Sequence, residues 1–136
     1  MGGVLKYLKQ RWRTLFRPAH LKLGERGERI ARLVLERSGM EYLACNYRCR
    51  NGEIDLIFRE HDVLCLVEVK TRHRSRFAPE TAVNWEKKKR ISRAGRRYIR
   101  QQNLRGRKVR CDIVEVIFEG RKLAEVHHLR NAFELL

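Results

Sequence analysis

Two short apolar runs with alternating polar positions dominate the hydrophobic pattern of the chain. The first extends from Gly52 to Phe58 and the second from Val63 to Lys70, with a polar link of hairpin length between them. Both runs are rich in β-branched and large apolar residues, which favours strands over helices. The short link predicts that the two strands pair as an antiparallel hairpin.

The alternation assigns the side chains of the first run to two faces, because residues two apart in a strand point the same way. We expect Ile54, Leu56 and Phe58 on one face of the sheet. Glu53 and Asp55 are then expected on the other face. Glu53 could alternatively pair with a nearby arginine.

The second run carries two charged residues, Glu68 and Lys70, on one face. A hairpin would bring them beside Asp55 at one end of the sheet. Carboxylates are costly to bury unless they are paired or bind a metal, and Mg²⁺ is commonly held by one or two of them. A lysine beside such an ion could orient or help deprotonate an attacking water.

Other elements surround this pair. A helix is expected from about Lys22 to Arg37, closed by Gly39. A strand from Glu41 to Cys49 follows, and Asn51-Gly52 signals a tight turn into the next strand. These predictions give three consecutive antiparallel strands.

The C-terminal half is predicted to contain one long helix and two strands. The helix spans Thr81 to about Gln102, and strands follow over Val109 to Phe118 and Lys122 to Leu129. Asn131 to Leu136 is expected as a short end piece. The resulting fold class is α/β (α+β).

Positive charge dominates the composition. Lys and Arg number 32 against 16 Asp and Glu, which gives a net charge of +16, while 43% hydrophobic residues indicate a globular domain. So large an excess favours a polyanionic partner, with nucleic acid as the first candidate and an anionic membrane as the second. Nucleic-acid contacts are expected from basic residues after the second strand of the pair and on the long helix: Arg72, Arg74, Lys87, Lys88 and Arg97.

Residues 1–20 form a separate basic segment, in which apolar residues recur at helical spacing before Pro18. It could pack on the domain at 21–136, act as a nucleic-acid arm, or lie on a membrane surface. No apolar run reaches the ~20 residues of a transmembrane segment. The N-terminus also lacks a signal-peptide core, so we expect a cytoplasmic protein.

The cysteines are expected to be reduced thiols, because their spacing lacks the paired pattern of a zinc ribbon. Two of them, Cys65 and Cys111, lie in apolar runs and are expected in the core. Cys45 and Cys49 lie in the first predicted strand.

An acidic residue on one strand followed by Glu-x-Lys on the next resembles the PD-(D/E)xK nuclease core. More broadly, the stretch from about Gly24 to Phe133 is similar to the YraN-like family of uncharacterised bacterial proteins with an endonuclease-like domain. The matching motifs are Gly27-Glu28-Arg29-Ile30-Ala31, Asn46-Tyr47-Arg48, Gly52 to Ile57 (GEIDLI), Val67 to Arg72 (VEVKTR), Lys87, Arg110-x-Asp112 and Asn131-Ala132-Phe133.

This resemblance implies a restriction-endonuclease-like core of order αβββαβ, with a mixed central sheet flanked by helices. It implies a nuclease that hydrolyses phosphodiester bonds with Mg²⁺ or Mn²⁺ held by Asp55 and Glu68, and with Lys70 in a catalytic role. Glu28 occupies the position of a third acidic site residue, although a carboxylate there could simply complement the helix N-terminus. Asp112 is expected to support the sheet or pair with a basic residue.

The resemblance favours DNA over RNA as the substrate, including branched or structured DNA. The alternative is a non-catalytic nucleic-acid-binding protein that retains the nuclease fold. The sequence does not fix the oligomeric state, and the resemblance allows a homodimer.

Overall fold

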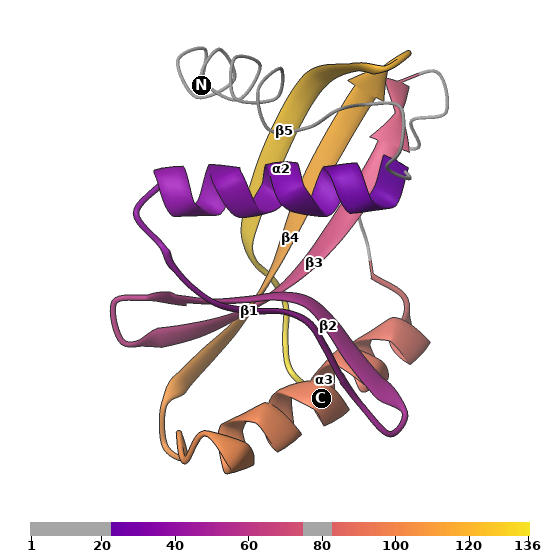
Figure 1. Ribbon diagram of the computed structural model, residues 1–136. Coiled ribbons are helices and arrows are strands. Elements are labelled where there is room, and N and C mark those ends of the chain that lie inside the picture. The colour runs from indigo at the N-terminus through magenta and orange to yellow at the C-terminus, as the bar shows by residue number, and fades with distance from the viewer. Residues whose placement is uncertain (1–22, 75–82) are drawn as a thin grey trace.

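A computed structural model describes residues 23–74 and 83–136. The basic segment at 1–20 lies outside these ranges, as does most of the segment that follows Arg74. Within them the chain forms two helices and five strands (Figure 1). In order these are α2 (Leu23–Arg37), β1 (Glu41–Cys49), β2 (Gly52–Glu60), β3 (Val63–His73), α3 (Trp85–Gln101), β4 (Lys108–Glu119) and β5 (Lys122–Phe133).

The five strands form one mixed sheet in the order β1-β2-β3-β4-β5. The first three are antiparallel neighbours, which confirms the predicted meander. β4 runs parallel to β3, since α3 carries the chain back between them, and β5 returns antiparallel to β4. This mixed sheet with flanking helices agrees with the predicted restriction-endonuclease-like α+β fold.

The helices cover opposite faces of the sheet and enclose two cores. Alternation along β4 shows the division, because Val114 packs on the side of α2 and Ile113 packs on the side of α3. Figure 1 shows α2 across β3, β4 and β5, and α3 beside the hairpin of β1 and β2. Residues of the α2-side core include Ile30, Leu35, Leu56, Phe58 and Val67. Residues of the α3-side core include Ile54, Ile57, Leu66, Ile91 and Ala94.

The predicted alternation of β2 is wrong at Ile54, which packs in the α3-side core although Leu56 and Phe58 pack in the α2-side core. The reason lies on the two neighbouring strands. Asn46 of β1 has a left-handed φ of 48° and lies opposite Asp55. Asn tolerates this conformation better than most residues. On the other side of β2, the pairing with β3 ends at Leu56 and Val67, and the Asp55 side chain takes the Val69 amide, so Asp55 lies at the break in alternation.

Two predicted element boundaries also need correction. Val83 and Asn84 are not helical, and α3 begins at Trp85 rather than at Thr81, a residue outside the described ranges. Asn84 is the N-cap, and its side chain accepts a hydrogen bond of 2.8 Å from the Lys87 amide. At the other end of the chain, β5 continues to Phe133 instead of ending at Leu129.

Gly52 allows β2 and α3 to approach each other closely. A Cβ at this position would lie 2.8 Å from the Arg90 carbonyl oxygen and 2.9 Å from the Ala94 amide nitrogen. Both atoms belong to the helix backbone, so neither can move without shifting α3. The glycine of the Gly52-Glu53 pair is therefore a packing requirement, and it holds Glu53 against the helix.

We expect Gly52→Ala to lower the free energy of unfolding by about 1–3 kcal/mol, the usual cost of overpacking a tight contact. Urea denaturation measures this change. Gly24→Ala is the matched control, because nothing lies within 4 Å of a Cβ there and alanine favours the helix. Equal stability of the two variants would contradict the close packing at Gly52.

Candidate active site

The two predicted acidic residues of the central hairpin lie side by side. Leu56 pairs with Val67, so Asp55 and Glu68 are the next residues along the two antiparallel strands. Asp55 is fixed against β3, because its Oδ2 accepts a hydrogen bond of 2.8 Å from the Val69 amide. The carboxyl group of Asp55 therefore takes the place of a backbone acceptor in the sheet and lies next to Glu68.

Helix α2 adds Glu28 to this pair. The helix packs tightly on β3 at the preceding residue, where a Cβ on Gly27 would lie 1.9 Å from Thr71 Oγ1. Burial and the nearby Asp55 carboxylate raise the pKa of Glu28, and a hydrogen bond from Asn46 opposes the rise. The predicted third acid thus lies within electrostatic reach of Asp55. We call Glu28, Asp55 and Glu68 the acidic cluster.

Glu68 is the most deeply buried member of the acidic cluster. The residue is 8% exposed, and its Oε2 is buried without a hydrogen-bond partner. Burial, followed by the field of Asp55, raises the pKa of Glu68 to about 8. Lys87 and Lys70 act against this rise. The described protein groups therefore do not fully balance the negative charge of an ionised Glu68.

Lys87 joins the acidic cluster from α3. Its Nζ lies 2.9 Å from Glu53 Oε1 and 3.6 Å from Glu68 Oε1. Burial lowers the pKa of Lys87, but the surrounding Glu53, Glu68 and Asp55 carboxylates raise it above its ordinary value. Arg90 also approaches Glu53, at 3.5 Å. The alternative that Glu53 pairs with a nearby arginine is therefore confirmed at Arg90, although Lys87 is the nearer partner.

Lys70 follows Glu68 on the same face of β3 and is half-buried. Its charge opposes the rise in the pKa of Glu68, which places it near that carboxyl group. On the neighbouring strand it is in register with Glu115. The structure thus brings together all four residues for which we predicted catalytic roles: Glu28, Asp55, Glu68 and Lys70.

The acidic cluster fits a divalent cation in part. Within residues 23–74 and 83–136, no three His, Cys, Asp or Glu side chains are arranged to hold a metal ion by themselves. Mg²⁺, however, is commonly bound by one or two carboxylates, with phosphate and water as the other ligands. Asp55 and the unsatisfied Oε2 of Glu68 are the oxygens that such an ion would use. The metal ligands therefore remain a prediction.

The residues predicted to bind nucleic acid do not gather at one place. Arg74 lies 3.3 Å from Glu119 and 3.1 Å from Glu125. Arg72 Nε lies 3.8 Å from Glu115, and Lys88 lies over the ring of Phe133 at 5.8 Å. Of the five residues, Lys87 reaches the acidic cluster, and Arg97 is exposed on α3.

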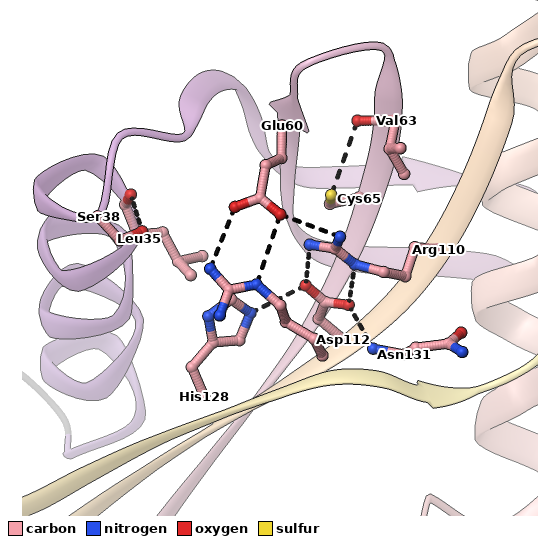
Figure 2. Close-up of polar contacts among 10 residues, drawn as sticks. Leu35, Ser38, Glu60, Val63, Cys65, Arg110, Asp112, His128 and Asn131 are labelled. Atoms are coloured by element: carbon pink, nitrogen blue, oxygen red, sulfur yellow. Dashed lines mark hydrogen bonds and ion pairs between the residues drawn. The ribbon is translucent and has the colours of Figure 1, made fainter.

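Asp112 pairs with basic residues, as predicted, and is completely buried (Figure 2). Arg110 donates to both of its oxygens, at 2.8 Å and 3.0 Å, His128 Nε2 lies at 2.9 Å, and the Asn131 amide donates at 2.9 Å. Burial would raise the pKa of Asp112, but these hydrogen bonds lower it below its ordinary value. Arg110 also bonds Glu60, so the network joins β2, β4 and β5.

Sequence reasoning did not predict two contributions to the acidic cluster, from Asn46 and from the Glu53–Lys87 pair. A signal existed for Lys87. It lies four positions before the buried Ile91 and therefore on the sheet-facing side of α3. Asn46 was marked by the Asn46-Tyr47-Arg48 motif of the resemblance, but that motif did not indicate a contact with Glu28.

The raised pKa of Glu68 predicts a decrease in stability as the pH rises. Between its ordinary pKa and about 8, the folded protein keeps a proton that the unfolded chain has lost. The contribution of Glu68 to stability is therefore fully present in mild acid and is lost as the pH rises through about 8. We expect the free energy of unfolding to fall on the order of 2–4 kcal/mol over this range.

Urea denaturation at about pH 5 and about pH 8 measures this slope in metal-free protein. Glu68→Gln removes the titrating group, so its slope should be clearly smaller than that of the parent. Identical slopes would contradict the raised pKa. Other groups titrate in both proteins and cancel in the difference.

The fold consists of an antiparallel meander that a helix joins to a parallel strand. Acidic residues and a lysine cluster at its central hairpin. These features define an α+β protein of restriction-endonuclease-like architecture. The chain belongs to the family described as Uncharacterised protein family UPF0102, whose sequence profile matches residues 27–116. The resemblance to YraN-like proteins is thereby confirmed. The matched range contains the acidic cluster, Lys70 and Lys87.

Bacterial relatives match over most of their length. A UPF0102 protein of Alkaliphilus metalliredigens is 40% identical over 112 residues, which cover 82% of this chain and 96% of that protein. A UPF0102 protein of Geobacter metallireducens is 37% identical over 114 residues, with coverages of 83% and 93%. A third, from Beutenbergia cavernae, is 39% identical over 110 residues, with coverages of 80% and 93%.

Neither α2 nor α3, the helices in the described ranges, is long and apolar enough to cross a membrane.

Proposed function

We propose that this protein is a metal-dependent nuclease that hydrolyses phosphodiester bonds in DNA. The observation that carries the proposal is the acidic cluster: Asp55 and Glu68 adjoin on paired strands, Glu28 is near, and Lys70 follows on the same face as Glu68. A buried carboxylate oxygen without a partner supports a positively charged ligand at this point.

Asp55 and Glu68 would hold Mg²⁺ or Mn²⁺, with Glu28 completing the site directly or through water. When bound, such a cation lowers the pKa of a coordinated water and neutralises charge on the phosphate. Lys70 positions the attacking water, helps to remove its proton, or stabilises charge that develops in the transition state. Lys87 supplies a second ammonium group. After this group moves away from Glu68, it contacts the substrate phosphate.

The overall charge of +16 supports a nucleic-acid substrate. Phosphate contacts from Lys and Arg supply most of the non-specific affinity for DNA. The four cysteines are free thiols, which fits a reducing cytoplasm as the site of this activity.

A second function, non-catalytic binding of nucleic acid, is favoured by the position of Lys87. Its ammonium already contacts Glu53 and Glu68, so it balances part of the negative charge without a metal ion. A binding module that retained the fold would keep this pairing and the basic surface.

Calorimetry separates the two functions. The nuclease proposal predicts that Mn²⁺ binds the parent protein and that Asp55→Asn, which keeps the size of the side chain, loses this binding. It also predicts Mn²⁺-dependent cleavage in a panel of single-stranded, duplex, flapped and branched DNA. Absence of Mn²⁺ binding and of cleavage, with DNA binding retained, would favour the non-catalytic module.

A further inference from the structure

The solvent-facing side of α3 carries one aromatic residue followed by cations. We call five of its residues the outer stripe: Trp85, Lys89, Arg93, Arg96 and Arg100. They are separated by four, four, three and four positions, and this spacing places them along one side of the helix. At 1.5 Å per residue the stripe is about 22 Å long.

Trp85 is unusual in being exposed. It is 59% exposed, and Leu136 is the other large apolar residue exposed in the described ranges. Because Asn84 caps α3, Trp85 is the first residue of the helix, and Lys89 Nζ lies 5.9 Å from its ring centre. The packing of the domain does not require an indole at this position.

The remaining outer stripe is of one sign. Glu86, in the first turn, is the single acidic residue of α3. Lys89 Nζ lies 3.8 Å from Glu86, and Arg96 donates to the Leu136 oxygen, so part of this charge is balanced within the domain. Arg93 contacts the neutral carbonyl oxygen of Asn51 at 3.4 Å, which orients the guanidinium without cancelling its charge. An exposed helix commonly mixes acidic and basic residues, so this arrangement indicates a polyanionic partner.

The outer stripe begins at the end of α3 that also carries Lys87. Lys87, two residues after Trp85, reaches Glu53 and Glu68 at 2.9 Å and 3.6 Å. Lys87 faces the sheet and Trp85 faces solvent on the opposite side of the helix, about 3 Å apart along its axis. A nucleic-acid strand that leaves the proposed site over the start of α3 would therefore meet Trp85.

We infer that the outer stripe binds a single-stranded segment of DNA that adjoins the cleaved bond, with Trp85 stacked on an unpaired base. The inference rests on the proposed function and adds a substrate class to it: DNA with an unpaired tail rather than continuous duplex. Aromatic side chains stack on any base, and cations beside them follow the phosphates, which is how proteins bind single strands without reading sequence. A base inside a duplex is already stacked on its neighbours and is not free to cover the indole.

A membrane surface fits this face less well. Interfacial helices insert a broad apolar face between lipid headgroups. The apolar face of α3, with Ile91, Ala94 and Tyr98, is buried in the α3-side core. The outer stripe contains a single aromatic residue, Trp85, at the start of the helix, and this is not a broad apolar face.

The test measures binding of labelled DNA to the full chain by fluorescence anisotropy, without added metal. One probe is a blunt duplex, and the other carries the same duplex with a single-stranded tail. We expect the parent to prefer the tailed probe, and Trp85→Ala to weaken binding of that probe on the order of tenfold. Trp85→Phe should restore most of the affinity, and binding of the blunt duplex should stay unchanged in both variants.

A second pair of variants tests the cations. Arg100→Ala should weaken binding of the tailed probe and reduce its salt dependence by about one unit of slope. Arg105→Ala removes the same charge from an exposed position outside the outer stripe, so it should have a smaller effect. Because these side chains are exposed, the variants should unfold at the same temperature as the parent.

Equal tailed-probe affinity of Trp85→Ala and the parent would overturn the inference, as would equal affinity of the parent for both probes. Binding to anionic phosphatidylserine vesicles without DNA binding would also overturn it. Preference for the tailed probe that depends on Trp85, in a protein that neither binds Mn²⁺ nor cleaves DNA, would end the nuclease proposal and leave the outer stripe supported.

Discussion

Asp55→Ala is expected to reduce Mn²⁺-dependent DNA cleavage by at least about a hundredfold, to the limit of detection, while DNA binding remains largely intact. The physical reason is the position of Asp55. Its Oδ2 bonds the Val69 amide, which fixes the carboxyl group next to Glu68. Loss of this group removes one of the two oxygens proposed to hold the cation. The basic residues proposed to bind phosphate are unchanged in this variant.

Lys70→Ala should give a similar loss of cleavage. Its ammonium is proposed to act on the attacking water. Single-turnover cleavage with excess enzyme measures the chemical step for both variants, and anisotropy measures binding separately. Lys108→Ala and Asp62→Ala are matched controls, because both residues are exposed and lie away from the acidic cluster.

Asp55→Asn separates a catalytic effect from a structural one. Asparagine keeps an acceptor for the Val69 amide but lacks the charge, so this variant should fold and remain inactive. Cleavage at the parental rate by Asp55→Ala or Lys70→Ala would remove the active-site assignment. Loss of cleavage together with loss of folding in all three variants would show that these residues stabilise the sheet instead.

Asp112→Asn is expected to cause the largest loss of stability, about 3–5 kcal/mol in the free energy of unfolding. Asp112 is completely buried and is bonded by Arg110, His128 and the Asn131 amide. The substitution removes a negative charge that compensates the guanidinium of Arg110. Breaking one side of a buried ion pair costs more than the pair contributes, because the remaining charge loses compensation. Within the described ranges, Arg110 would keep only Glu60, at 3.0 Å, as an acidic partner.

Urea denaturation measures the effect, with Glu41→Gln as the control. Glu41 pairs with Arg59 on the surface, and exposed pairs of this kind contribute about 0–1 kcal/mol. Because the pKa of Asp112 is lowered, the contribution of its carboxylate to stability is present at neutral pH and is lost in acid. The difference in free energy of unfolding between the parent and Asp112→Asn should therefore become smaller in acid. A loss no larger than that of the control would contradict a stabilising network.

The network around Asp112 has a consequence for the acidic cluster. Arg110 joins Asp112 to Glu60 at the end of β2, on the strand that carries Asp55. These contacts connect β2 to β4 across β3 and limit how far the strands can shift. The acidic cluster therefore depends on a sheet whose register is fixed on both sides of β3.

Much of the sheet could be predicted from local patterns. The alternation and the short link predicted the pairing of β2 with β3, and shifting that register by one residue would turn apolar side chains toward the wrong face. The proximity of Asp55 and Glu68 follows from this register. Gly39, with a φ of 97°, ends α2 as its position predicted.

Predictions failed mainly where distant segments decide the outcome. Ile54 changes face where the pairing of β2 with β3 ends, beside the left-handed Asn46 of β1. The start of α3 depended on Asn84, whose side chain caps the helix before the apolar pattern becomes regular. The contact of Lys87 with Glu53 joins residues 34 positions apart. The Asn84 cap is a local feature, whereas the face of Ile54 and the partner of Lys87 depend on other strands.

The sequence by itself determined the strands of the meander, the pairing of β2 with β3, the basic character of α3 and the meeting of Asp55 with Glu68, because these depend on side-chain period, turn length and residue type. The tertiary structure alone decided the burial of Glu68, the direction of Lys87 and the approach of Glu28. Burial and charge balance arise from atoms of several elements packed together, so a carboxyl group acquires its pKa only when the sheet and both helices are in place.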